Sequence, residues 1–203
     1  MRTRTAAAAV AAAAIAVSVA ACSPSEEAST ETHDMSSMSS SQHASESASQ
    51  DAGEHNAADV MFAQMMLPHH EQALVMSDII LGKKDIPESV TTLATQIKDA
   101  QGPEIAQLKA WLKGWGEPEH QEMDHEMDGM LSEEELDELR AAEGTEAAKM
   151  FLTQMIEHHE GAVTMAEDEI EDGRHADSIT MSKAIVESQQ KEIDQMKALL
   201  KEL

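Results

Sequence analysis

The 203-residue chain has a single cysteine, Cys22. It cannot form an intrachain disulfide, and it has no second thiolate with which to hold a metal ion. Positive charge is also scarce, because 14 Lys and Arg face 39 Asp and Glu. The formal charge of −25 repels phosphate, so nucleic acid is not expected as a partner.

Aromatic residues are few, with two Phe, two Trp and no Tyr. Trp111 and Trp115 lie one turn apart and are expected to pack in the core or at an interface. The chain is rich instead in 15 Met and 10 His. Thioether and imidazole groups suit Cu(I), and imidazole with carboxylate suits Cu(II), whereas Met is a poor ligand for Zn, Mg, Ca or Mn. Copper is therefore the metal to expect, and no organic cofactor is indicated.

The apolar run near the start of the chain is too short to make a good membrane-spanning helix. A basic start, the uncharged stretch 6–19 and the sequence Val19-Ala-Ala-Cys22 follow one another. This pattern predicts a signal peptide over residues 1–21 and a lipobox that directs acylation of Cys22. We expect an exported protein, anchored by lipid to the cell membrane and facing the periplasm or the extracellular side. Its mature part would have 12 Lys and Arg against 39 Asp and Glu, a formal charge of −27.

Residues 22–56 consist mainly of Ser, Glu, Ala and Thr, a composition typical of disorder. We interpret this segment as a tether between the membrane and the folded part. It carries scattered side chains that could bind a metal, namely His33, Met35, Met38, His43 and His55.

Residues 57–203 contain an internal repeat. Residues 62–76 align without gaps on residues 151–165, and both copies carry the pattern Met-x-x-His-His-Glu-x-Ala-x-x-Met. A weaker pair follows in each half, where Gln101 and Glu104 correspond to Gln189 and Glu192. Apolar residues recur at helical spacing in all four segments. Each half is therefore predicted to be a pair of helices, and the duplication is expected to bring the two His-His-Glu turns towards each other across the core.

The fold class predicted is all-α: a four-helix bundle formed by tandem duplication of a helix pair, with a short extra helix in the crossover. The first repeat covers about 57–116, the linker 117–131, the short helix about 132–142 and the second repeat about 145–203. Ser132 and Glu135 form a capping box that predicts the start of the short helix. Gly114 is expected to end the second helix. Kinks are expected at Pro68 and at Gly102-Pro103.

The repeated motif supplies the candidate metal ligands of the bundle. His69 and His158 lie at the centre of apolar stripes, whereas His70 and His159 are predicted at the stripe edge, within reach of solvent. A histidine on an apolar face is also compatible with a hydrogen-bonded core role, and methionine at this spacing with plain packing. Four polar residues on the facing helices are expected either to hydrogen-bond the imidazoles or to orient them as ligands. The candidate ligands are Met66, His69, His70, Met76, Met155, His158, His159 and Met165, and the supporting residues are Gln101, Glu104, Gln189 and Glu192.

A second candidate site lies in the crossover, in a segment that is not expected to pack. An acidic linker would explain its carboxylates but not its repeated thioethers. The expected ligands are His120, Met123, His125, Met127 and Met130. Methionine needs no deprotonation to bind a metal, so such a site would work in an acidic periplasm.

The repeated motif at 62–76 and 151–165 resembles the bacterial family known as domain of unknown function 305. The resemblance covers most of residues 57–203. It implies a ferritin-like helical bundle and, by similarity to members of the CopM type, a periplasmic or secreted protein that binds copper and contributes to copper tolerance. Carried over by position, it points to the eight Met and His residues of the two motifs.

Three functions are compatible with these features. The first is a copper-binding lipoprotein without catalytic turnover, which sequesters or transfers metal. The second is a metal-free acidic module that binds an envelope protein or another copy of itself. The third is a di-metal carboxylate oxidase using His69, His158, Glu104 and Glu192. That class needs Glu-x-x-His on two bundle helices, and here the pattern occurs only in the crossover, so no catalytic residue is assigned.

Overall fold

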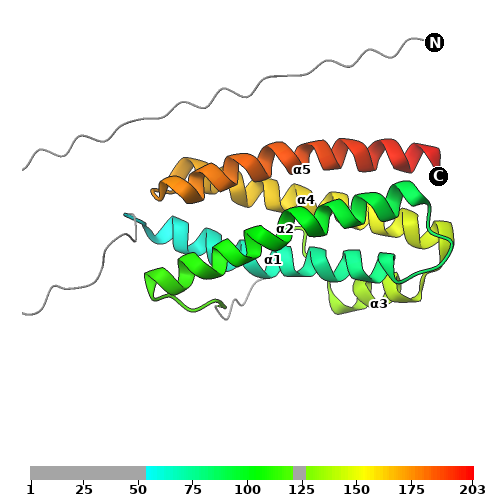
Figure 1. Ribbon diagram of the computed structural model, residues 1–203, viewed down its shortest axis with the longest axis horizontal. Coiled ribbons are helices and arrows are strands. Elements are labelled where there is room, and N and C mark those ends of the chain that lie inside the picture. Colours follow the sequence, from blue (N-terminus) through cyan, green and yellow to red (C-terminus); the bar gives the residue numbers. More distant parts are fainter. Residues whose placement is uncertain (1–53, 121–126) are drawn as a thin grey trace, which may run out of the picture. The chain divides into compact units, whose positions relative to one another are not determined.

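The computed structural model describes residues 54–120 and 127–203, which belong to one compact unit. Regular structure in these two ranges is helical, without strands: α1 (Ala57–Leu81), α2 (Glu88–Trp115), α3 (Glu133–Ala141), α4 (Gly144–Asp172) and α5 (Ala176–Glu202). The four long helices lie side by side, and the short α3 lies beside α1 and α4 (Figure 1). The predicted all-α bundle with a short extra helix is confirmed. Within the same ranges, none of the helices has the length and apolarity needed to cross a membrane.

Several sequence predictions fall outside the described residues. These are the signal peptide, the lipidation site Cys22, the tether up to residue 53, and the crossover residues Met123 and His125.

Local signals explain most helix ends. α3 begins at the predicted capping box of Ser132 and Glu135, and α1 begins at a similar box formed by Asn56 and Asp59. The predicted end of α2 at Gly114 is wrong. The helix continues to Trp115, because the left-handed conformation that closes it (φ 78°) is taken by Gly116.

Pro68 lies inside α1 and Pro103 inside α2, and neither residue ends its helix. A proline removes one hydrogen bond from the helical ladder. Both helices bury long faces against their neighbours, so tertiary packing can maintain them through the missing bond.

The order of the helices requires a long crossover. α1 packs against α2 and α4, and α4 packs against α5, whereas α2 and α5 touch only briefly. α1 and α4 are antiparallel, because the side chain of Asn56, before α1, donates to the carbonyl oxygen of Asp172, at the end of α4 (2.8 Å). α2 and α4 therefore run in the same direction, and the connection between them must travel along the bundle.

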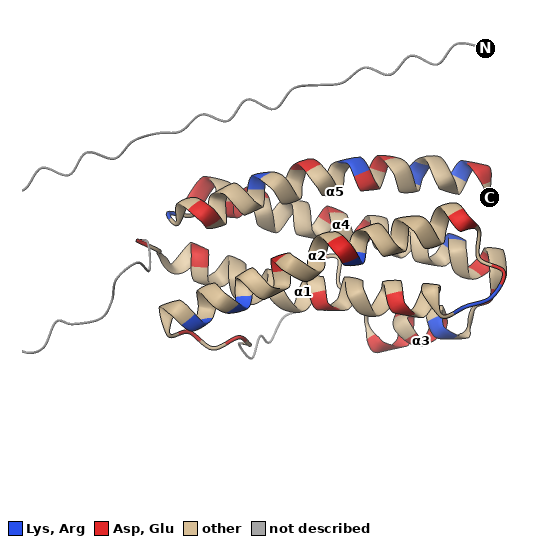
Figure 2. Cartoon of the chain, viewed as in Figure 1, with Lys and Arg blue, Asp and Glu red and all other residues tan. Residues whose placement is uncertain are grey.

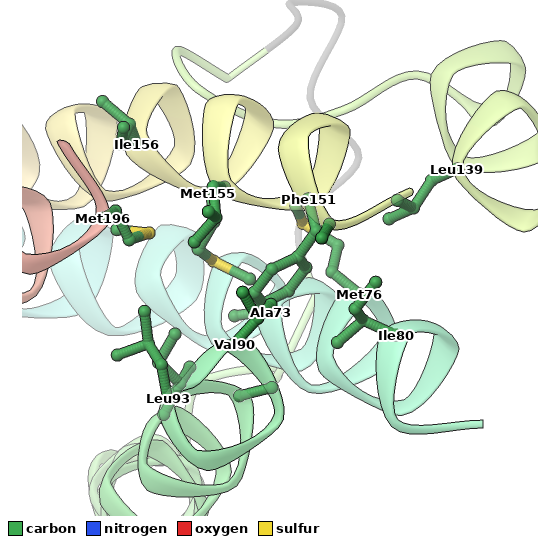
Figure 3. Packing of buried hydrophobic residues seen from close by; sticks show 14 of the residues in the cluster. Ala73, Met76, Ile80, Val90, Leu93, Leu139, Phe151, Met155, Ile156 and Met196 are labelled. Atoms are coloured by element: carbon green, nitrogen blue, oxygen red, sulfur yellow. The ribbon is translucent and has the colours of Figure 1, made fainter. Parts of the chain in front are cut away.

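The core consists of two apolar clusters. One lies towards the end of α1 and includes Ala73, Met76, Phe151, Met155 and Met196 (Figure 3). The other lies towards the beginning of α1 and includes Phe62, Met66, Leu108, Ala162 and Ile185. The paired histidines fall between these two sets of residues along α1 and α4.

Aromatic rings pack together at the end of the bundle where α1 begins. Trp111 and Trp115 are stacked with ring centroids 6.1 Å apart, and His55 stacks on Trp115 at 4.7 Å. His175 meets both tryptophans edge-on, at 5.2 and 5.3 Å. The predicted packing role of the two tryptophans is confirmed.

Two carboxyl groups are buried at the same end. Burial opposes the ionisation of Asp59, but backbone N–H groups of His175 (2.8 Å), Asn56 (2.6 Å) and Arg174 (3.0 Å) donate to it, and their combined effect lowers its pKa. Burial raises the pKa of Glu169 to about 8, and the neighbouring Asp59 adds to the shift. Glu169 is therefore protonated in the folded protein at neutral pH.

This arrangement predicts a stability loss at alkaline pH that depends on Glu169. In the folded state Glu169 keeps its proton up to about pH 8, whereas an unfolded glutamate releases it near 4.5. The stabilising effect of protonation is complete below pH 4.5 and is lost as the pH rises through 8. Glu169→Gln should flatten the decline in melting temperature between pH 5 and 9, leaving the variant several degrees more stable than wild type at pH 9.

Thermal melts at several pH values test this, with Glu171→Gln as a control because Glu171 is exposed on the same helix. If Glu169→Gln and wild type lost stability in parallel up to pH 9, deprotonation of Glu169 would not be the cause of the alkaline loss of stability.

Candidate metal centre

The two repeated motifs meet at the centre of the bundle. The imidazole rings of His69, on α1, and His158, on α4, lie with centroids 3.7 Å apart and an interplanar angle of 40°. Both side chains are buried. The prediction that duplication brings the two His-His-Glu turns together across the core is confirmed.

The adjacent histidines each bind a carboxylate from the partner helix of the same half. His70 Nε2 lies 2.7 Å from Glu104 Oε2, and His159 Nε2 lies 2.6 Å from Glu192 Oε2. A carboxylate can only accept, so Nε2 carries the hydrogen, and in the neutral form of the ring Nδ1 then keeps a lone pair. The two halves are built alike, and we call the set His69, His70, Glu104, His158, His159 and Glu192 the histidine layer.

The prediction that His70 and His159 lie at a solvent-accessible edge is wrong, since both are fully buried. The prediction holds only for a helix that is covered by neighbours on one face. α1 instead packs against α2 on one side and α4 on another, and α4 likewise packs against α1 and α5. The buried part of each helix surface is therefore wider than the apolar stripe seen in the sequence.

The histidine layer contains many polar atoms without partners. Six buried imidazole nitrogens accept or donate no hydrogen bond within the described ranges: both nitrogens of His69 and of His158, and Nδ1 of His70 and of His159. Buried polar groups without partners are rare in folded proteins, and each one calls for an explanation. A ligand that binds imidazole nitrogen would provide one.

The central pair is held in its neutral form. Burial lowers the pKa of His69 to about 3, and the neighbouring His70 and His159 act in the same direction. Burial and the neighbouring histidines, His69 first, also lower the pKa of His158 well below its usual value. Neutral imidazoles keep their lone pairs, which is the state that a metal ion requires.

The glutamines of α2 and α5 do not satisfy these rings. Gln101 is buried with both side-chain polar atoms unpartnered among the described residues, and Gln189 has an unpartnered Oε1. The expected hydrogen bonds to imidazole are therefore made by Glu104 and Glu192 and not by the glutamines. The carboxylates bind His70 and His159, and not the central pair on which the di-metal oxidase hypothesis relied.

Methionines from opposite helices flank the layer. Met76 of α1 and Met155 of α4 share one apolar cluster, and Met66 of α1 packs in the other, with the partly buried Met165 of α4 against it. Since α1 and α4 are antiparallel, each side of the central histidine pair receives one methionine from each helix. The four methionines of the motifs are thus brought close to the layer as two cross-helix pairs.

The end of the crossover packs over the histidine layer. We call residues 127–131 the strap. The side chain of Gln72, on α1, accepts from the N–H of Leu131 (2.7 Å) and donates to its carbonyl oxygen (2.8 Å). Leu131 itself is buried. The prediction that the crossover does not pack is wrong for this part, because two hydrogen bonds and an apolar anchor hold it.

Two glycines let the strap approach α4 closely. A Cβ on Gly129 would lie 2.7 Å from the carbonyl oxygen of Glu157 and 3.1 Å from Cα of His158, and Gly129 has a positive φ of 81°. A Cβ on Gly161 would collide with the carbonyl group of Asp128. The strap therefore lies against the turn of α4 that carries His158.

The remaining crossover candidates are exposed or border a cleft. His120 is exposed, and Gln64 of α1 fixes the segment before it through the carbonyl oxygen of Pro118 (3.0 Å). Met127 and Met130 are partly buried and line a cleft of about 700 Å³ between the strap and α3, together with Glu134 and Glu138. Of the predicted crossover ligands that the structure describes, His120 is therefore exposed, and Met127 and Met130 lie beside α3.

Comparison with known proteins defines the family. The family described as a domain of unknown function, DUF305, matches residues 59–200. The chain belongs to the DUF305 family. The match covers both helix pairs, the strap and α3, and so includes the whole histidine layer. No curated protein matches the chain.

Solved DUF305 structures have the same fold. A predicted secreted protein from Streptomyces coelicolor is 34% identical with a TM-score of 0.68, covering 71% of this chain and 93% of that one. A DUF305 fragment from Deinococcus radiodurans is 34% identical with a TM-score of 0.68, covering 73% and 98%. CopM in its Cu(I)-bound form is 32% identical with a TM-score of 0.60, covering 71% and 96%. CopM has also been solved with Cu(II), with Ag and in the apo form.

The donor set of this DUF305 chain limits the chemistry of the layer. Within residues 54–120 and 127–203, no three His, Cys, Asp or Glu side chains are grouped so as to hold a metal ion. A hard metal that needs several oxygen or nitrogen ligands does not fit such a site. A soft ion bound by imidazole and thioether does fit, because the methionines of the two motifs pack in the apolar clusters on either side of the histidines.

Three residues that fix the strap, Gln72, Gly129 and Gly161, were not predicted from the sequence. The repeat contained a signal for two of them. Gln72 and Gly161 occupy equivalent positions of the motif, and the crossover contacts each in a different way. The difference between Gln72 and Gly161 therefore marks where the strap, which has no counterpart in the other half, packs on the bundle.

The buried histidine pair predicts acid sensitivity. The folded pKa of His69 is about 3 and that of His158 is also lowered, whereas unfolded histidines take up protons near 6.5. Stability is complete above pH 6.5 and falls with decreasing pH, by at most about 1.4 kcal/mol per pH unit for each histidine. Replacing both by Leu should reduce the loss of stability between pH 6.5 and 4. Urea unfolding at several pH values measures it, with exposed His120→Leu as a control; an acid dependence unchanged by the double replacement would contradict the assignment.

Proposed function

We propose that this protein is an exported lipoprotein that binds copper, chiefly Cu(I), through histidine and methionine side chains, and sequesters it or passes it on. The proposal draws on CopM, which shares the fold and has been solved with copper and silver bound. Its main support within this chain is the set of six buried imidazole nitrogens without hydrogen-bond partners in the described ranges.

The histidine layer has the features of a soft-metal site. His69 and His158 face each other as neutral imidazoles, and the cross-helix pairs Met76/Met155 and Met66/Met165 supply thioethers on either side. Cu(I) prefers these donors. We assign His69 and His158 as the central ligands and the four methionines as the donors that complete their coordination.

Glu104 and Glu192 have a supporting role in this proposal. A carboxylate that accepts from one ring nitrogen fixes the tautomer and leaves the other nitrogen available to a metal. The contacts of His70 and His159 support this role, because Glu104 and Glu192 bind Nε2 and Nδ1 has no partner among the described residues. The side chains of Glu104 and Glu192 are 22% and 17% exposed, so they also connect the layer with solvent.

The crossover provides a second proposed binding region, comprising His120, Met123, His125, Met127 and Met130. Its thioethers bind Cu(I) without losing a proton, and its histidines and carboxylates can bind Cu(II). Acidic residues are distributed over the helices and dominate α3, beside the strap (Figure 2). This negative surface attracts cations to the region.

Copper stoichiometry tests the proposal. In a Cu(I) competition titration, His69→Leu with His158→Leu should lower the stoichiometry at the layer while the chain stays helical, because the apolar clusters on both sides are unchanged. Met123, Met127 and Met130 replaced together by Leu should lose Cu(I) affinity at least tenfold at the crossover, about 1.4 kcal/mol, with little change in melting temperature. Met61→Leu is the matched control, since Met61 is 59% exposed.

Copper stoichiometry and affinity equal to wild type in both multiple variants would reject the proposed sites. The acidic interaction module would then be the better description of the chain.

The lipid anchor requires a separate test. Mass spectrometry of protein extracted from membranes should detect a diacylglycerol-modified Cys22 at the mature N-terminus, and Cys22→Ser should release the protein from the membrane fraction. An unmodified mature N-terminus in the soluble fraction of wild-type cells would exclude the anchor.

A further inference from the structure

The strap, which carries Met127 and Met130, lies next to the helical turns that carry the buried histidines. The strap lies on the turn of α4 that carries His158, as the close approach of Gly129 to its Cα shows. On the other side, Gln72 of α1, which follows His69 by three residues, binds the N–H and the carbonyl oxygen of Leu131. The strap therefore bridges α1 and α4 close to the turns that carry His69 and His158.

The side chains on either side of this turn face a different environment. Met127 and Met130 line the cleft between the strap and α3, where the acidic residues Glu134 and Glu138 also lie. Glu134 and Glu138 are exposed. The cleft thus combines soft donors, negative charge and access from solvent, whereas His69 and His158 are buried.

The strap is held by contacts that can be broken without disturbing a helix. Its hydrogen bonds to α1 come from one side chain, Gln72, and its approach to α4 depends on Gly129 and Gly161. None of these contacts belongs to the backbone ladder of α1 or α4. Movement of the strap therefore requires no helix of the bundle to unwind.

We propose that Met127 and Met130 form an entry site for a soft monovalent cation, which they transfer to His69 and His158 when the strap moves. This inference rests on the proposed function of the histidine layer and adds the route by which the layer is filled. The transfer is a ligand exchange without a redox step: thioether sulfurs release the ion as imidazole nitrogens bind it, and its charge is unchanged. Gln72 and Gly161 act as positioning residues that keep the strap closed.

Kinetics of Cu(I) exchange with a coloured chelator test the proposal on the full chain. Wild type should take up Cu(I) in a fast and a slow phase, and the slow phase should disappear in His69→Leu with His158→Leu. Met127→Leu with Met130→Leu should slow that phase at least tenfold and leave its amplitude unchanged. Met61→Leu with Met65→Leu is the matched control, because these methionines lie on α1 outside the cleft.

Release from the layer tests the positioning residues. Gly161→Ala pushes the carbonyl of Asp128 away from α4, and Gln72→Ala removes both bonds to Leu131, so each should accelerate release to excess chelator at least fivefold. Gly102→Ala is the control, since a Cβ there contacts nothing within 4 Å. Equal release rates in all three variants and wild type would overturn the role of the strap.

The outcomes separate this inference from the function on which it rests. If the slow phase persists in the double histidine variant, the layer is not the copper site and the proposed function fails. If the slow phase requires the histidines but keeps its rate without Met127 and Met130, the transfer is overturned and the function stands. Complete loss of its amplitude in the methionine variant would make these thioethers permanent ligands of the layer and would also overturn the transfer.

Discussion

A polar layer interrupts the apolar core and joins the four long helices to one another. The hydrogen bonds His70–Glu104 and His159–Glu192 join each pair of helices within a half, and the contact of His69 with His158 joins the halves. Each unpartnered buried nitrogen lowers the stability of the folded state by about 1–3 kcal/mol. Leucines at the same positions would therefore give a more stable core than this layer. The apolar clusters on both sides offset that cost, and for this reason the chain can keep a binding site inside its core.

Duplication explains the symmetry of the layer, and the crossover explains where the symmetry fails. Both halves supply His-His-Glu, a carboxylate from the next helix and flanking methionines. Only one connection can run along the bundle, however, and it crosses the α1–α4 groove on one face. The first half therefore has Gln72 to bind the strap, and the second half has Gly161 to make room for it. The two halves therefore share the residues that form the histidine layer, and they differ at the positions where the strap packs.

The sequence allowed the helices, their number and the meeting of the two motifs to be predicted, because these follow from periodicity and from the repeat. It did not allow the burial of His70 to be predicted. That depends on how many neighbours surround α1, which is a tertiary property. The end of α2 was misplaced by two residues, because Gly114 and Gly116 are equally good candidates until a backbone conformation distinguishes them. The strap was missed because close backbone approach at Gly129 joins residues distant in the chain.

Burial of the central histidines, which destabilises the fold, also lowers their pKa values and so favours metal binding. Burial makes protonation of His69 and His158 unfavourable, so protons compete weakly for the same lone pairs down to about pH 3 for His69. An exposed histidine near 6.5 would lose its metal in a mildly acidic environment, whereas a buried pair and thioethers would not. Burial, however, also closes the central histidine pair to solvent. A buried soft-metal site needs a route of access, and the strap can provide one, because it lies against the turn that carries His158 and has Met127 and Met130 in the cleft beside α3.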